Sequence, residues 1–289
     1  MLTLDLKQIV SRTNFTDWCL NSHRETLIMG IVNVTPDSFS DGGQFYQAES
    51  AIDYGLSLIK DGAEILDIGG ESTRPGAESI SKDEEINRIL PVIKGLRKID
   101  QEILISIDTT KSAVAAKAIE AGADIVNDIS GLTLDKKMAK VVSKLDIPVV
   151  IMHMNGSPAT MQKNPHYENL VGEISSFFLN QINVAKAAGI QSNKIILDPG
   201  IGFGKTMVHN FTLIQKLNKF CELGFPILIG PSRKAFIGTT LDLPTNERVE
   251  GTAAAVSAGI LNGARIVRVH DVKEMKRVVT ITEKIRTAA

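Results

Sequence analysis

Residues 65–76 read ILDIGGESTRPG, where a short apolar run passes directly into glycines and then into polar and charged residues. The run is too short for a helix and contains β-branched residues, so it predicts a strand buried on both faces, as the strands of parallel sheets are. The same change from an apolar run to polar residues recurs along the chain. This recurrence decides which fold the sequence predicts.

Eight runs of this kind occur, and segments of helical length lie between them. The runs are TLIMGIVNV, AEILDIGG, ILISIDTT, ADIVNDISG, IPVVIMHM, KIILDPG, FPILIGPS and ARIVRVHDV. Eight strand–helix pairs within roughly 260 residues predict an α/β fold, a single-domain (β/α)8 TIM barrel. We assign residues 1–25 to an N-terminal lead-in and residues 26–289 to the barrel. A doubly wound sheet is less favoured, because no glycine-rich dinucleotide turn follows the first strand.

The composition excludes several classes of protein. The 289 residues are 43% hydrophobic, enough for one large core, and their formal net charge is -1. Without a basic excess, nucleic acid is not an expected partner, and no apolar run is long enough to span a bilayer. The two cysteines, Cys19 and Cys221, are isolated, so neither a disulfide framework nor a metal site built from cysteine and histidine is expected. We therefore expect a reducing, cytoplasmic location.

Polar residues end nearly every predicted strand. In a TIM barrel the chemistry lies on the loops after the carboxyl ends of the strands, so these residues would share one rim. A single aspartate there can simply cap the next helix, but a whole rim of polar residues is hard to explain by capping. The strand-end residues are Asn33, Asp108, Asn127, His153, Asp198, Ser232, Lys234, Arg268 and His270.

Two carboxylates and one amide, at Asp108, Asp198 and Asn127, would project into the mouth of the barrel. They suit a flat heterocycle with several N–H donors. They equally suit a metal site or an acid/base pair, and spacing alone leaves these alternatives open.

Other motifs indicate anion and metal binding. Ser232 and Lys234 lie at a helix start, where an anion is favoured, although a plain serine cap is the simpler alternative. Arg268 alternates with His270, so both can face the same side, and an arginine there can stack on a ring or hold a phosphate. Asn33, in NVTPDSFSDGG, could offer a hard oxygen to Mg²⁺. The glycines of LDPGIGFGK would allow close approach of a ligand.

From about Leu27 on, the chain resembles the dihydropteroate synthase family. The resemblance rests on NVTPDSFSDGG, GGESTRPG, SIDTTK, NDISG, MHMNGSPATMQ, LDPGIGFGK, SRK and RVHDV. It implies that 6-hydroxymethyl-7,8-dihydropterin diphosphate condenses with p-aminobenzoate to give 7,8-dihydropteroate and diphosphate. It also implies a dissociative mechanism, Mg²⁺ as cofactor, inhibition by sulfonamides and a homodimer. The alanine-rich stretch GTAAAVSAGILNGA would permit the close helix contact that a dimer needs.

The resemblance also implies roles for individual residues. It implies that the second strand is structural and that the loop after this strand carries the functional residues. The implied catalytic residues are Asp108, Lys234 and Arg74. The implied binders of pterin and diphosphate are Thr73, Asp108, Asn127, Asp198, Lys234, Arg268, Val269 and His270. The implied p-aminobenzoate site is Phe39, Pro75, Phe203 and Ser232, and the implied Mg²⁺ ligand is Asn33.

Three other functions are weighed against this interpretation. A methyltetrahydrofolate-binding methyltransferase domain shares a pterin-binding barrel, but it has no diphosphate to hold, which NVTPDSFSDGG and SRK argue against. A non-catalytic pterin binder would show a damaged loop, and both loops are intact. A generic phosphate-binding barrel would leave the carboxylate pair without a role.

Overall fold

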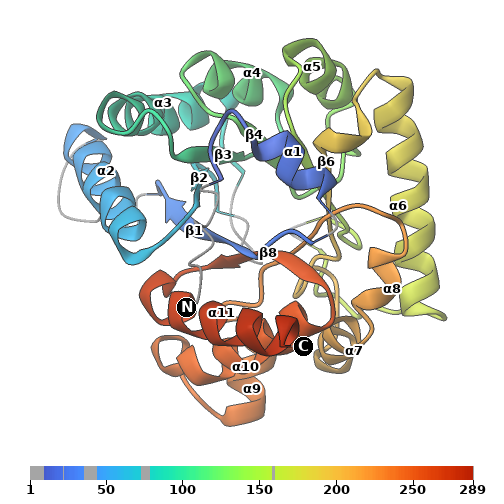
Figure 1. Ribbon diagram of the computed structural model, residues 1–289. Helices are drawn as coiled ribbons and strands as arrows, with labels where there is room; N and C mark the ends of the chain where they lie inside the picture. The colour runs from blue at the N-terminus through green and yellow to red at the C-terminus, as the bar shows by residue number, and fades with distance from the viewer. Residues whose placement is uncertain (1–9, 22, 36–43, 73–78, 158–159, 289) are drawn as a thin grey trace, which may run out of the picture.

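A computed structural model of the chain describes residues 10–21, 23–35, 44–72, 79–157 and 160–288. Eight parallel strands close into a barrel in chain order, and helices surround it (Figure 1). The strands are β1 (Leu27–Asn33), β2 (Ile65–Gly69), β3 (Leu104–Asp108), β4 (Ile125–Asp128), β5 (Val149–Met152), β6 (Ile195–Asp198), β7 (Ile227–Ile229) and β8 (Ala264–Val269). The predicted (β/α)8 barrel is confirmed.

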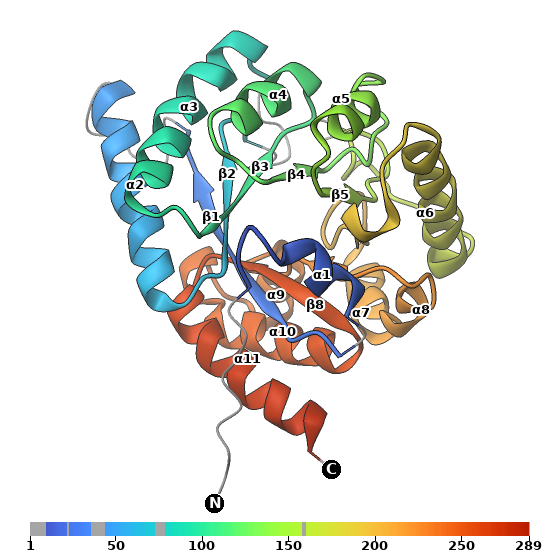
Figure 2. The same cartoon turned by 45° about the horizontal axis from the view of Figure 1, so that its top comes forward.

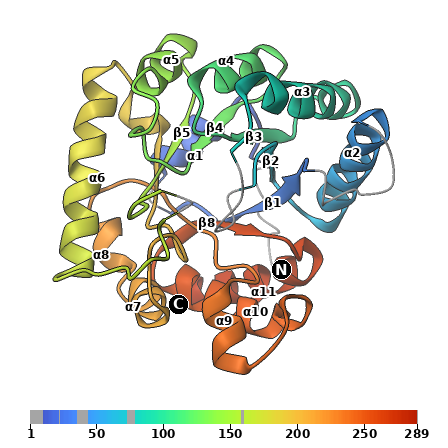
Figure 3. The ribbon, with the colours of Figure 1, turned by 180° about the vertical axis from the view of Figure 1, so that it is seen from behind.

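At least one helix follows each strand and packs on the outside of the barrel, as the view from behind in Figure 3 also shows. These helices are α2 (Gln44–Asp61), α3 (Lys82–Ile99), α4 (Ser112–Glu120), α5 (Met138–Leu145), α6 (Leu170–Ala187), α7 (Met207–Gln215), α8 (Asn218–Cys221), α9 (Ala235–Leu241), α10 (Val249–Leu261) and α11 (Val272–Thr287). Short 3₁₀ turns lie at η2 (Ser192–Lys194) and η3 (Thr245–Glu247).

The side chains of each strand alternate between the barrel interior and the helices, because successive residues of a strand point to opposite faces. The outward positions, such as Ile28, Leu66 and Ile105, form the large core under the helices. The lowest inward positions, such as Met29, Ile65 and Leu104, form a second, smaller core inside the barrel. This inner core is an apolar floor beneath the C-terminal rim.

A short helix closes the floor from below. Helix α1 (Phe15–Leu20) packs Phe15 and Trp18 onto the inner core, with their rings stacked 5.5 Å apart. Figure 2 shows α1 lying across the near end of the barrel. The segment predicted as a lead-in therefore contains a helix that packs on the barrel, while the boundary drawn at residues 25 and 26 stays a prediction.

Above the floor, the inward positions become polar. Along β2 they run Ile65, Asp67 and Gly69, and along β3 they run Leu104, Ser106 and Asp108. The strand register places Asn33, Gly69 and Asp108 in one row at the C-terminal rim. Sequence and register together thus put an apolar layer below and polar layers above.

Some predicted residues lie outside this description. Phe39, Thr73, Arg74 and Pro75 are not among the described residues, so their roles stay predictions. Within the described part of the chain, no helix is long and apolar enough to cross a membrane.

Candidate active site at the C-terminal rim

Arg268, from β8, reaches across the barrel to two carboxylates. Its Nε donates to Asp67 Oδ2 at 2.6 Å, and its Nη2 donates to Asp108 Oδ2 at 2.9 Å. Asn127 Nδ2 donates to the same Asp67 oxygen at 3.1 Å. Four strands thus contribute to one buried polar network, which fixes these side chains relative to one another.

This network leaves acceptor atoms unsatisfied. Asp108 Oδ1 and Asn127 Oδ1 are buried and have no hydrogen-bond partner among the described residues. A buried acceptor without a partner costs about 1–3 kcal/mol, so such atoms are rare unless a ligand completes them. The two oxygens therefore suit a ligand that presents N–H donors.

The ion pairs shape the electrostatics of the network. Burial works to lower the pKa of Arg268, but the carboxylates of Asp67 and Asp108 outweigh it and raise that pKa above its usual value. Burial raises the pKa of Asp108 to about 7, although Arg268 opposes the shift. Asp67 adds to the rise through like-charge repulsion. Ionisation of Asp108 therefore carries a cost, which a developing positive charge nearby would relieve.

Another carboxylate and a lysine follow on the rim, Asp198 at the end of β6 and Lys234 at the start of α9. Asp198, at the end of β6, accepts from the backbone N–H of Gly200 at 2.7 Å. Burial raises its pKa, against that hydrogen bond and against the positive charge of Lys234. Burial also lowers the pKa of Lys234 to about 7, with Asp198 opposing the shift. Lys234 donates to the carbonyl of Ile201 and lies 4.4 Å from the centre of the Phe203 ring.

The SRK motif lies at a helix start, as predicted, and forms a turn that leads into α9 with Lys234 at the N-cap position. Its central residue, Arg233, has a left-handed backbone with φ 57°, and its guanidinium pairs with Asp271 instead of facing the rim. Ser232 is buried and contacts His270. It accepts from the His270 backbone N–H at 3.1 Å, and its Oγ lies 3.0 Å from His270 Nδ1. Ser232 and His270, which follow β7 and β8, are thus in contact.

Asn33 lies beside the empty side-chain position of Gly69. A Cβ built on Gly69 would lie 3.8 Å from Asn33 Oδ1 and 3.8 Å from Asp108 Oδ2. The described residues contain no cluster of three His, Cys, Asp or Glu side chains that could hold a metal ion. Mg²⁺ is commonly bound by one or two protein oxygens plus substrate phosphates, so a single amide oxygen at the rim fits its chemistry.

The MHMNGSPATMQ and LDPGIGFGK motifs meet in a contact between two loops. Lys205 Nζ donates to the Phe203 carbonyl at 2.8 Å and to the His153 carbonyl at 3.3 Å, and it lies 3.1 Å from His153 Nδ1. A Cβ on Gly200 would lie 2.0 Å from the His153 carbonyl oxygen, and one on Gly204 would lie 2.5 Å from a backbone oxygen. These glycines allow the two loops to touch, and close approach of a ligand to them stays a prediction.

The structure brings most predicted residues together and adds one. Asp108, Asn127 and Arg268 join one network, whereas the side chain of Val269 points away into the core under the helices. Sequence reasoning treated β2 as structural and did not identify Asp67, which binds both Arg268 and Asn127. The signal was an aspartate within an apolar strand, two positions before the rim and on the inward face.

Several known proteins are similar to this chain over most of its length. Residues 29–270 match the model of a family described as pterin binding enzyme. A dihydropteroate synthase from Synechocystis is 47% identical, over 96% of this chain and 94% of that protein. A Clostridium difficile dihydropteroate synthase, solved in the presence of pteroic acid, superposes with a TM-score of 0.86 at 44% identity, over 91% of this chain and 97% of that one. A Yersinia pestis dihydropteroate synthase, solved with a sulfonamide drug, gives a TM-score of 0.86 at 41% identity, over 92% and 95%.

Proposed function

The chain belongs to the dihydropteroate synthase family, and from this premise we propose how its rim residues perform the family's reaction. The protein condenses 6-hydroxymethyl-7,8-dihydropterin diphosphate with p-aminobenzoate, which forms 7,8-dihydropteroate and diphosphate for folate synthesis. The observation that carries the assignment of this site is the set of buried, unpaired acceptors at Asp108 and Asn127. A pterin ring edge carries N–H and NH₂ donors that would pair with them.

The pterin is held by the upper polar layer of the barrel. Asp198, Asn127 and Asp108 accept from its ring donors, and Lys234 donates to its acceptors. Arg268 packs on the ring face while its guanidinium stays paired with Asp67 and Asp108, which supports a fixed orientation. Since all of these side chains except Lys234 come from strands rather than loops, we expect the pocket to be formed before the ligand arrives.

The reaction breaks the bond between the pterin methylene carbon and the diphosphate oxygen, and then forms a bond from that carbon to the amine nitrogen. The pterin carries positive charge between these steps, and the departing diphosphate carries away the bonding electrons. The carboxylate of Asp108 stabilises the cation electrostatically, and no nucleophilic side chain is required. The amine loses one proton after it attacks.

The diphosphate lies at the side of the rim where cations and donors gather. His270, Thr73 and Arg74 bind its oxygens, and Lys234 and Arg74 assist its departure. Asn33 holds Mg²⁺, which when bound neutralises charge on the diphosphate. The position of Asn33 beside the open space over Gly69 supports this role.

The p-aminobenzoate site is proposed at Phe203 and Ser232, with Phe39 and Pro75 from the two long loops. Phe203 supplies an apolar ring next to Lys234, and Ser232 supplies a hydroxyl beside His270. Sulfonamides would compete here, because they share the aromatic amine of p-aminobenzoate. The Yersinia pestis relative solved with a sulfonamide drug supports that expectation.

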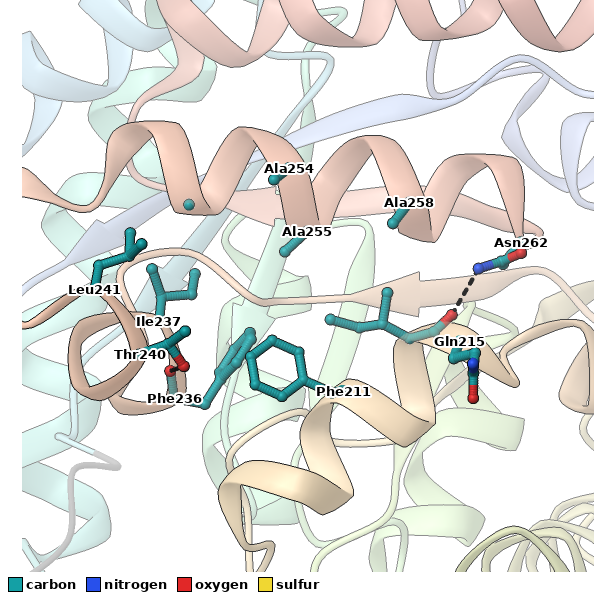
Figure 4. A pocket seen from close by; sticks show the side chains of 12 residues that line it. Phe211, Gln215, Phe236, Ile237, Thr240, Leu241, Ala254, Ala255, Ala258 and Asn262 are labelled. Carbon is teal, nitrogen blue, oxygen red and sulfur yellow. Dashed lines mark hydrogen bonds between the residues drawn. The ribbon is translucent and has the colours of Figure 1, made fainter.

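The protein is further proposed to act as a homodimer in the cytoplasm. An apolar groove of about 480 Å³ lies between α7, α9 and α10, away from the catalytic rim. In Figure 4, Phe211 and Phe236 point toward the alanines of α10, which leave the groove open. Its lining is Phe211, Ile214, Gln215, Phe236, Ile237, Thr240, Leu241, Gly251, Ala254, Ala255, Ala258 and Asn262.

The chemistry of this groove favours a second copy of the chain as its occupant. The alanine-rich segment predicted to make a close helix contact is the α10 wall of the groove. Beside it, Val208 is 64% exposed and Phe211 is 44% exposed. Neither α7 nor α9 contains an acidic residue, a lysine or an arginine, which suits burial against an identical face.

The reaction is tested with the purified protein, Mg²⁺, the pterin diphosphate and p-aminobenzoate. We expect dihydropteroate and diphosphate in equal amounts, with no product when either substrate is left out. Binding of pterin diphosphate without turnover would instead indicate a non-catalytic pterin binder. Methyl transfer from methyltetrahydrofolate to a corrinoid would indicate the methyltransferase class.

A further inference from the structure

Asp67 lies one layer below the rim, in the middle of β2, and it is completely buried. One of its oxygens, Oδ2, accepts from both Arg268 Nε and Asn127 Nδ2. These two donors come from β8 and β4, on different sides of the barrel interior. Asp67 is therefore the point at which two of the proposed pterin binders are held in place.

The contact with Asp67 decides which way the Asn127 amide faces. An ionised carboxylate only accepts hydrogen bonds, so Asn127 must direct its NH₂ group toward Asp67. The other end of the amide, Oδ1, then faces away from Asp67 as an acceptor. That oxygen is buried and has no partner in the described part of the chain, as a ligand-binding acceptor would be before its ligand arrives.

Arg268 is oriented in the same way. With its Nε bound to Asp67, its Nη2 reaches Asp108 Oδ2, which leaves Asp108 Oδ1 unpaired. Together with Asp67 Oδ1, the network has three buried acceptor oxygens without a partner among the described residues, and in each group another atom is already engaged. The pocket is thereby biased toward a ring edge that donates.

We propose that Asp67 is a positioning residue that determines specificity, because it turns the Asn127 amide oxygen and the Arg268 guanidinium into the arrangement that selects an N–H-rich ring edge. The proposal rests on the proposed function in one respect, namely that Asn127 binds the pterin. Asp67 itself need not touch the ligand.

The variant Asp67→Asn tests this with almost no change in volume. An amide at this position can donate to Asn127 Oδ1, so the Asn127 amide would turn or lose its fixed orientation. We expect the Kd for pterin diphosphate, measured by calorimetry, to rise roughly tenfold or more, as the mispairing of one buried group predicts. The KM for p-aminobenzoate should change less than about twofold, because its proposed site makes no contact with Asp67.

Ser106→Ala is the matched control. Ser106 pairs in register with Asp67 on the neighbouring strand, and its hydroxyl is buried without a partner among the described residues. Removing it disturbs the same layer without touching the network, so pterin affinity should stay within about twofold of wild type. An equal loss in both variants would overturn the proposal, because it would show that any change in this layer weakens the pocket.

A double-mutant cycle separates positioning from general damage. If Asp67 acts through Asn127, then Asp67→Asn should weaken pterin binding much less in an Asn127→Ala background than in the wild type. If the two losses multiply instead, Asp67 acts independently of Asn127 and the proposal is wrong.

One measurement uses the wild-type protein alone and so does not depend on whether a variant folds. In isotope-labelled NMR spectra of the wild type, the side-chain N–H₂ of Asn127 should exchange slowly with solvent, because it donates to a buried carboxylate. Rapid exchange would overturn the Asp67 contact. Dihydropteroate formation by the wild type is independent of this result, so failure of the proposal and failure of the proposed function are distinguishable.

Discussion

At the scale of single residues, the site is governed by the cost of burying charge. Asp67, Asp108 and Arg268 lie in the barrel interior, where an unpaired charge would be costly and a hydrogen-bonded pair is tolerated. Two carboxylates share one guanidinium, so the arrangement carries excess negative charge. Burial raises the pKa of Asp108, the neighbouring carboxylate of Asp67 adds to the rise, and the excess negative charge suits a cationic intermediate.

Asn33→Ala tests the assigned Mg²⁺ ligand at this scale. Loss of the amide oxygen should weaken coordination, so the Mg²⁺ concentration needed for half-maximal rate should rise. The KM for p-aminobenzoate should change little, since Asn33 is not in its proposed site. The measurement is a Mg²⁺ titration of initial rate, and an unchanged half-maximal concentration would remove Asn33 as the ligand.

The sequence predicted residues at strand ends better than those deeper in the barrel. Asp108, Asn127 and Asp198 could be identified because they end apolar runs, and parallel strands end at one rim. Asp67 lies two positions earlier, where a polar residue looks like an interruption of the strand. Its partner, Arg268, is 201 positions away in the chain, and only the closure of the barrel brings them together.

At the scale of elements, two loops support the aromatic wall of the site. Lys205 joins the His153 and Phe203 carbonyls, and Tyr167 Oη donates to the Gly204 carbonyl at 2.9 Å. The loop that carries Phe203 is thus anchored by the loop before it. Sequence reasoning identified both motifs but could not assign this contact, because it depends on how two backbones approach each other.

His153 gives this contact a pH dependence. Burial, with the positive charge of Lys205, lowers the pKa of His153 from 6.5 to about 3. Between these values the unfolded chain binds a proton that the folded protein does not, so stability should fall as the pH drops below 6.5. The free energy of unfolding should decrease by up to about 1.4 kcal/mol per pH unit from this group alone.

Urea unfolding between about pH 7 and about pH 5 measures this dependence. His153→Gln should reduce the slope of stability against pH by about one proton, because the variant lacks the titrating ring. His166→Gln, at an exposed histidine, controls for the loss of an imidazole from the chain. The same slope in wild type and His153→Gln would contradict the buried neutral state of His153.

At the scale of the whole molecule, the closed floor, the polar rim and the apolar groove lie at three different places on the barrel. Helix α1 and the apolar floor close one end, polar layers form the opposite rim, and the groove between α7, α9 and α10 faces outward. The barrel and its eight strands were predictable from periodicity. The packing of α1 under the floor was not, because nothing in its short sequence specifies which surface it covers.

The proposed dimer is tested by a charge placed in its groove. Val208→Glu puts a carboxylate at an exposed apolar position beside the groove, so the mass measured by sedimentation should fall from two chains to one. Ile281→Glu, on α11 and similarly exposed, is the control and should remain dimeric. A wild type that sediments as a single chain, or a dimer that survives Val208→Glu, would contradict this interface.

The central claim is that the polar rim of this barrel binds the pterin edge, and titration calorimetry with pterin diphosphate tests it most directly. Asp198→Asn replaces an acceptor by a group that presents N–H to ring N–H, which should weaken binding by about 1–3 kcal/mol, or roughly 5- to 150-fold. Asp128→Asn makes the same change at a buried carboxylate whose oxygens are engaged by Ser130 and Leu132, and it should leave affinity near the wild-type value. Wild-type affinity in Asp198→Asn would contradict the account.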